Sequence, residues 1–156
     1  MNVLIFSDSH GNYKKVHYIV EKETPDMVVF CGDGYRDYTK LKQAFPAIEF
    51  VGVRGNCDYG ARLPESLAIN VRATRIYVTH GHLFNAKYNY DRVVYAAEEQ
   101  AAGLLCFGHT HTPYKDLIRG LVIINPGAAS DNRYAIAEIS DDGKIDVKLM
   151  KEAKTY

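Results

Sequence analysis

The sequence has no excess of charge of either sign, and it contains few cysteines. Its 19 basic and 19 acidic side chains give a formal net charge of +0, without a basic block or an acidic tail. The composition therefore gives no electrostatic support for nucleic acid as the main partner. The three cysteines are an odd number without CxxC spacing, which argues against a disulfide framework and against a structural zinc site.

Long hydrophobic runs are also absent. No segment approaches the length of a membrane span, and the apolar run at the N-terminus is short and lacks the charged lead-in of a signal peptide. We therefore expect no membrane partner and a reducing, cytoplasmic location. The 156 residues suffice for one domain with a substantial core, so a single domain over residues 1–156 is expected.

The first third of the chain alternates short apolar runs with helical segments. Buried strands are expected at residues 2–6, 26–31 and 48–53, with helices at residues 13–23 and 38–44 between them. This βαβαβ order predicts parallel strands joined by right-handed crossovers.

The remainder of the chain is predicted to be mostly β. One helix, the longest of the chain, is expected at residues 88–102, with Gly103 as its C-terminal stop. Strands, most of them in hairpins, are expected at residues 67–71, 75–79, 104–107, 114–118, 121–124, 133–139 and 145–150. The pattern predicts an α/β fold in which a two-sheet β-sandwich is flanked by α-helices, in a four-layer αββα order.

Side chains that can bind metal follow five of these strands. In chain order they are Asp8 and His10, Asp33, Asn56, His80, and the pair His109 and His111. Ligands of α/β proteins bind beyond the carboxyl ends of strands, and carboxylates and imidazoles are ligands of divalent metals. Each loop alone is a weak signal, because such residues also stabilise turns. Together, the repeated placement at strand ends predicts a metal centre.

The order and spacing of these motifs resemble the calcineurin-like metallophosphoesterase family. The resemblance covers residues 2 to about 150 and rests on Asp8-x-His10, Gly32-Asp33, Gly55-Asn56, His80-Gly81 and Gly108-His109-x-His111. The small size, the Asn56-Cys57-Asp58 loop and the Asn125-Pro126-Gly127 segment are most similar to the small bacterial and archaeal phosphodiesterases.

The resemblance implies a dinuclear metal-dependent phosphodiesterase that acts on a small-molecule phosphate ester. Asp8, His10 and His111 would hold one metal, Asp33 would bridge to the second, and Asn56, His80 and His109 would complete the second site. Mixed oxygen and nitrogen ligands favour transition metals, here Mn²⁺ first, with Fe²⁺, Ni²⁺, Co²⁺ or Zn²⁺ as alternatives. A hydroxide that bridges the two metals would attack phosphorus in line.

Cys57 departs from the family pattern. Many members carry a histidine directly after the Gly-Asn pair, where it protonates the leaving group, and a thiol with a pKa of about 8.5 is a poor substitute for it. His82, a metal-bound water or no acid at all are the options that remain. We therefore expect the best activity on esters with good leaving groups. Arg54 is predicted either to bind the substrate phosphate or to form a structural salt bridge.

The main alternative is a non-catalytic interaction module, because the same fold serves as a scaffold in a subunit of the retromer complex. A nuclease is a third option, which the neutral charge weakens. A homodimer is also considered, because apolar and tyrosine-rich segments are present.

Four further roles are expected: a helix cap at Asn12, a structural histidine at His17, a ligand-orienting carboxylate at Asp58, and an inert loop thiol at Cys57. Tyr88, Tyr90 and Tyr95 either line a pocket or pack in the core and on the surface.

Overall fold

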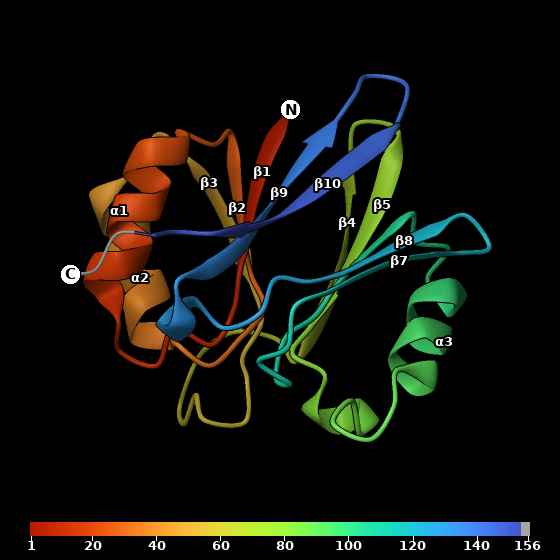
Figure 1. The fold of residues 1–156 in the computed structure, drawn as a ribbon, viewed down its shortest axis with the longest axis horizontal. Coiled ribbons are helices and arrows are strands. Elements are labelled where there is room, and N and C mark those ends of the chain that lie inside the picture. The colour runs from red at the N-terminus through yellow and green to blue at the C-terminus, as the bar shows by residue number, and fades with distance from the viewer. Residues whose placement is uncertain (154–156) are drawn as a thin grey trace.

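The computed structural model describes residues 1–153 as two five-stranded β-sheets packed face to face (Figure 1). The first sheet has the strand order β10-β9-β1-β2-β3, and the second has the order β4-β5-β6-β8-β7. The first sheet consists of β1 (Asn2–Phe6), β2 (Met27–Phe30), β3 (Glu49–Gly52), β9 (Arg133–Ile139) and β10 (Ile145–Lys151). The second consists of β4 (Ser66–Val71), β5 (Thr74–Thr79), β6 (Leu104–Cys106), β7 (Tyr114–Ile118) and β8 (Leu121–Asn125).

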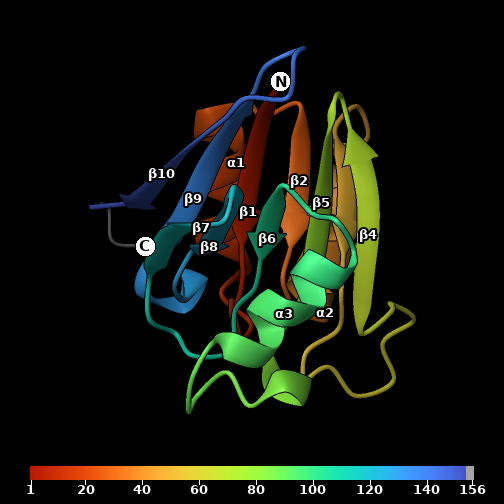
Figure 2. The ribbon, with the colours of Figure 1, turned by 90° about the vertical axis from the view of Figure 1, so that its right-hand side faces the viewer.

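Three α-helices complete the four layers. Helices α1 (Tyr13–Glu23) and α2 (Tyr35–Ala44) cover the outer face of the first sheet, and α3 (Asp91–Glu99) covers the outer face of the second (Figures 1 and 2). Two short 3-10 helices follow β5 and β8, at His82–Phe84 and Ala129–Asp131. The predicted two-sheet sandwich with helices outside is confirmed. No helix of the described residues is long and apolar enough to cross a membrane.

The central strands β1 and β2 of the first sheet form apolar runs because both of their faces are covered. In β1, Val3 and Ile5 pack into the core between the two sheets, while Leu4 and Phe6 pack against the helices. All four side chains are fully buried. A strand covered on both faces shows a continuous apolar run instead of alternation, which is the pattern that the sequence displays.

Parallel pairing in both sheets determines where the loops meet. Strands β1, β2 and β3 are parallel neighbours in the first sheet, and β5, β6 and β8 are parallel neighbours in the second. Parallel strands end at the same edge of their sheet, so the loops that leave β1, β2 and β3 lie together, as do those that leave β5 and β6.

The helix predicted at residues 88–102 is shorter than expected. Helix α3 has nine residues, and α1, with 11, is the longest helix of the described chain. The chain leaves the helix at Ala101, which has a left-handed φ of 52°, so Gly103 is not the stop. Gly103 instead passes close to β5, where an added Cβ would lie 2.5 Å from Thr74 Oγ1. The predicted helix end at Gly103 is therefore wrong, and this glycine instead permits close packing against β5.

Helix α2 begins at Tyr35, three residues earlier than the predicted start at residue 38. Its N-cap residue is Gly34, which has no side chain to cap the helix. The carboxylate of Asp58 does so from a distant loop, because its Oδ1 accepts the N–H groups of Gly34 at 2.9 Å and Tyr35 at 3.0 Å. A cap supplied from that far along the chain leaves no local sequence signal.

Candidate metal centre

The loops at five strand ends bring the seven predicted ligands to one edge of the sandwich. The first sheet supplies Asp8, His10, Asp33 and Asn56, which follow β1, β2 and β3, and the second supplies His80, His109 and His111, which follow β5 and β6. Their ligand atoms form two adjacent groups, so the centre lies between the two sheets and not on either one alone.

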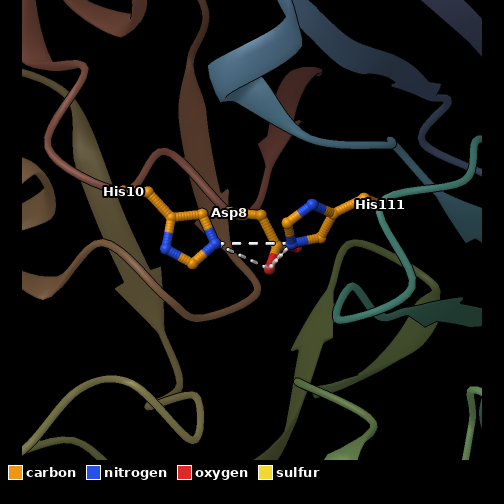
Figure 3. A group of neighbouring side chains, drawn as sticks. All are labelled: Asp8, His10 and His111. Atoms are coloured by element: carbon orange, nitrogen blue, oxygen red, sulfur yellow. Dashed lines mark hydrogen bonds and ion pairs between the residues drawn. The ribbon is translucent and has the colours of Figure 1, made fainter.

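The first group consists of Asp8, His10 and His111 (Figure 3). Asp8 Oδ1 lies 3.1 Å from His111 Nε2 and 3.6 Å from His10 Nε2, and the two ring nitrogens are 3.3 Å apart. Asp8 is fully buried, whereas both histidines are partly exposed. The three side chains therefore converge on one point that solvent can reach from the histidine side.

The second group consists of Asp33, His80 and His109, with Asn56 beside it. His80 Nε2 lies 3.2 Å from Asp33 Oδ2 and 3.1 Å from Asn56 Oδ1. The two groups are in contact, because His10 Nε2 is 4.0 Å from Asp33 Oδ2 and His80 Nε2 is 3.9 Å from Asp8 Oδ1.

The donor atoms of this centre fit divalent cations. Asp8 Oδ1 is buried, and among the described residues it accepts no hydrogen bond. A carboxylate oxygen in this position is costly unless a positive charge compensates it. His80 Nδ1 lies 2.7 Å from the carbonyl oxygen of Cys31, which can only accept, so Nδ1 donates and the lone pair of the neutral ring is on Nε2. That lone pair faces the oxygens of Asp33 and Asn56. Lone pairs at this distance repel each other, whereas a cation between them would be coordinated by all three atoms.

The pKa values of the polar groups reflect the same crowding. Burial would raise the pKa of Asp33, but the hydrogen bond and charge of His80 and the backbone N–H of Cys57 lower it well below its usual range. In the absence of a cation, burial would lower the pKa of His80, but the hydrogen bond that its protonated ring donates to Asp33 and the charges of Asp8 and Asp33 raise the pKa above its ordinary value. Burial, followed by the charge of His80, lowers the pKa of His109 to about 4. His109 is therefore neutral near pH 7 and has a free lone pair for a metal.

Five of the seven predicted ligands have strained backbones. Left-handed φ angles of 46° to 69° occur at Asp8, His10, Asp33, His109 and His111. Such conformations cost about 1 kcal/mol or more for a residue with a side chain, and they persist where the surroundings enforce them, often at functional sites.

Two glycines allow the loops to approach each other closely. A Cβ added to Gly55 would lie 2.0 Å from Asp33 Oδ1, and one added to Gly108 would lie 2.0 Å from Ser7 Oγ. Any side chain at these positions would displace the carboxylates of the centre.

Asp58 holds two ligand loops in place. Besides capping α2, it accepts through Oδ2 the N–H groups of Asp33 and Gly55, each at 2.8 Å. One carboxylate thus binds four backbone donors from the loops after β2 and β3. The expected role of Asp58 in orienting a ligand agrees with these contacts, but the number of its partners did not follow from the sequence.

Two further supporting residues were missed by the sequence reasoning. Asp37 Oδ2 accepts hydrogen bonds from Ser9 Oγ at 2.6 Å and from the Gly11 N–H at 2.9 Å, which fixes the loop that carries His10. Asn125 Nδ2 donates to Gly108 O and Thr110 Oγ1, at 3.0 Å each, and steadies the loop of the two later histidines. For Asn125, the Asn-Pro-Gly segment was visible, but nothing in it indicated the partner.

The other predicted residues lie at the rim of the centre or away from it. His82 lies next to it, with its ring centroid 5.4 Å from that of His80 and 6.1 Å from that of His109. Arg54 pairs with Glu65 at 2.7 Å, the salt-bridge alternative of its two predicted roles. Asn12 occupies the N-cap position of α1, but its side chain donates to Ser9 O and caps no helix N–H.

Aromatic residues of the prediction lie further out. His17 packs between Tyr13 and Phe45, in agreement with a structural role. Tyr90 makes edge-to-face ring contacts with Phe107 and Tyr114. Tyr88 and Tyr95 are exposed.

Comparison with known proteins agrees with this geometry. Residues 1–142 match the calcineurin-like phosphoesterase superfamily domain. A curated relative, "Probable metallophosphoesterase YsnB" of Bacillus subtilis, is 36% identical over 151 residues, which cover 91% of this chain and 86% of the relative. A crystal structure of a conserved protein from Streptococcus pneumoniae, described as a predicted phosphoesterase, superposes with a TM-score of 0.82 at 31% identity and covers 96% of this chain and 88% of that one.

More distant structures share the fold. A Vps29 from Entamoeba histolytica complexed with Zn²⁺ has a TM-score of 0.74 at 20% identity, over 96% of this chain and 98% of that one. An archaeal phosphodiesterase has a TM-score of 0.70 at 17% identity, over 96% of this chain and all of the other. The match over most of the chain and the two groups of potential metal ligands lead to one conclusion: this protein belongs to the calcineurin-like phosphoesterase superfamily.

Proposed function

We propose that this protein is a dinuclear metal-dependent phosphodiesterase that hydrolyses small-molecule phosphate esters, with Mn²⁺ as the preferred metal. The observation that carries the proposal is the pair of adjacent ligand groups, Asp8, His10 and His111 beside Asp33, His80 and His109. A complete set of converging ligands supports an enzyme over the interaction-module alternative. The archaeal phosphodiesterase with the same fold supports the proposal.

Each residue of the centre has a definable task. Metal ions bound there would lower the pKa of a coordinated water towards neutrality and polarise a phosphoryl oxygen. Asp33 faces His10 on one side and His80 on the other, so its ionised carboxylate can serve both ligand groups. The Cys31 carbonyl fixes the ring of His80, which keeps Nε2 directed at Asn56 and Asp33.

A hollow beside the centre gives space for the substituents of a diester. It has a volume of about 300 Å³ and is lined by His10, Asp33, Tyr35, Arg36 and Tyr59, among others. A phosphodiester keeps one substituent after hydrolysis, and the exposed aromatic and cationic side chains of this hollow can hold an organic group next to the reacting phosphorus.

Hydrolysis of simple aryl esters tests the proposal. Protein stripped of metal and then loaded with Mn²⁺ should hydrolyse bis(4-nitrophenyl) phosphate, and it should hydrolyse the monoester 4-nitrophenyl phosphate more slowly. Release of 4-nitrophenolate is measured, with the metal-free protein as the control. A faster reaction with the monoester would overturn the diesterase assignment. Absence of hydrolysis with both sites filled would favour the interaction-module alternative.

The leaving-group preference depends on Cys57. A positioned general acid contributes about 10²–10⁴-fold for poor leaving groups, so we expect Cys57→His to improve hydrolysis of an alkyl aryl diester relative to bis(4-nitrophenyl) phosphate by about tenfold or more. The measurement is the ratio of kcat/KM for the two esters with Mn²⁺-loaded protein. His82→Gln serves as the companion variant, because His82 is the other candidate acid. An unchanged ratio in Cys57→His would show that this position does not determine leaving-group preference.

A further inference from the structure

Cys57 lies within the metal centre. Its Sγ, a ring nitrogen of His10 and a carboxylate oxygen of Asp33 all lie within 4.8 Å of one another. The loop is held in this position, because the Cys57 N–H donates to Asp33 Oδ1 at 2.8 Å and Asn56 Nδ2 contacts Sγ at 3.5 Å. The seven ligands described above do not include this sulfur, so the group is a third set of donor atoms.

A second observation indicates that a cation belongs at this place. His10 Nε2 also faces Asp8 Oδ1 at 3.6 Å. Asp8 is 0% exposed, and its Oδ1 has no hydrogen-bond partner among residues 1–153. An unpartnered, fully buried carboxylate oxygen is therefore directed at the histidine that Cys57 approaches. His10 thus faces carboxylate oxygens of both Asp8 and Asp33, and the Cys57 sulfur is a third kind of donor beside it.

We propose that Cys57 is a ligand for thiophilic divalent cations, which the centre binds through His10, Asp33 and the Cys57 sulfur. Zn²⁺ and Cd²⁺ would take the sulfur, whereas Mn²⁺ would leave it free, because thiolates select soft and borderline metals and carboxylates suit Mn²⁺. Coordination takes the sulfur as a thiolate and releases its proton to solvent. The inference rests on the metal centre of the proposed function, and it adds a donor that distinguishes between metals.

The exposure of the group determines what kind of site this is. His10 and Cys57 are both exposed, and Asp33 is buried beneath them. Three protein ligands with an open solvent side correspond to a site that keeps a position for water or substrate, unlike the closed four-ligand sites of structural zinc. A thiophilic metal would therefore occupy the reaction centre itself.

Titration with Cd²⁺ tests the proposal without reference to activity. The wild-type protein should develop a thiolate-to-metal charge-transfer absorption in the ultraviolet, and Cys57→Ser should not. Cys31 and Cys106 are buried and are present in both proteins, so the difference spectrum reports on Cys57 alone. We expect the variant to bind Cd²⁺ about ten- to a hundredfold more weakly, the loss that removal even of an outer-sphere partner causes. Mn²⁺ affinity, measured by calorimetry, should differ far less between the two proteins.

Alkylation gives a second readout on the unmodified chain. Iodoacetamide followed by mass spectrometry should label Cys57 in metal-free and Mn²⁺-loaded protein, and Cd²⁺ should protect it. A wild-type protein that binds Cd²⁺ without the absorption and without protection overturns the role of Cys57, and Mn²⁺-dependent hydrolysis would then still support the proposed function. If neither metal binds, the metal centre itself is wrong, and both proposals fall.

Discussion

Replacing Asp58 by alanine is expected to destabilise the protein by about 4 kcal/mol, since each buried donor left without an acceptor costs about 1–3 kcal/mol. The carboxylate accepts the N–H groups of Asp33, Gly34, Tyr35 and Gly55. Water that enters the vacated space can satisfy part of this loss, so the effect stays below the sum of four bonds. For a chain of this size, the melting temperature should fall by about 10 °C. Thermal and urea unfolding of the metal-free proteins measure the change.

Two control variants make the result interpretable. Asp116→Ala removes an exposed carboxylate of β7 that accepts hydrogen bonds from Tyr114 Oη and the Leu117 N–H, and we expect it to leave the stability nearly unchanged, as is usual on surfaces. Asp58→Asn keeps one acceptor oxygen and should lie between the two. Equal stability of Asp58→Ala and Asp116→Ala would show that the four contacts do not stabilise the fold.

Loss of both metals is the expected result of replacing Asp33, and loss of one is the expected result of replacing His10. Asp33 Oδ2 is 3.2 Å from His80 Nε2 and 4.0 Å from His10 Nε2, so its carboxylate lies between the two ligand groups and can serve both. His10 belongs to the side of the centre that also contains Asp8 and His111. Mn²⁺-loaded Asp33→Ala should therefore retain no tightly bound metal, while His10→Ala should retain about one equivalent.

Metal content after desalting, determined by plasma mass spectrometry, measures this difference. Asp33→Asn is the matched variant, because it keeps an oxygen for the Cys57 N–H and loses only the charge. It separates the loss of a ligand charge from the loss of loop structure. Two equivalents in both Asp33→Ala and His10→Ala would disprove the assignment of ligands, and an intact circular dichroism spectrum would exclude unfolding as the cause of any loss.

The sequence predicted the features that repeat along it. The short apolar runs of β1 and β2 fit strands covered on both faces, and the polar residues after each run marked the strand ends that meet at the centre. These predictions succeeded because parallel pairing places every such loop at one edge. The prediction that α3 ends at Gly103 was wrong. The left-handed residue is Ala101, and Gly103 instead allows close packing against Thr74.

The features that the sequence did not predict depend on partners far along the chain. Asp58 stabilises the site by accepting hydrogen bonds from four backbone N–H groups, and Asn125 does so by donating a hydrogen bond to the carbonyl of Gly108. The proximity of the Cys57 sulfur to His10 likewise exists only after the loops have met. Contacts between residues far apart in the chain leave no signal in the local sequence, so only the three-dimensional structure reveals them.

The position of the centre between the two sheets has a mechanical consequence. Asp8, His10, Asp33 and Asn56 come from one sheet and His80, His109 and His111 from the other, and His10 and His111 are 101 residues apart in the chain. A cation coordinated by both histidines would therefore cross-link the chain and close a loop of that length. A cross-link over about 100 residues removes about 4.7 kcal/mol of chain entropy from the unfolded state, in the loop-closure description used for disulfides. The three cysteines form no disulfide. Bound metals would therefore act as a reversible cross-link between the two sheets of the sandwich.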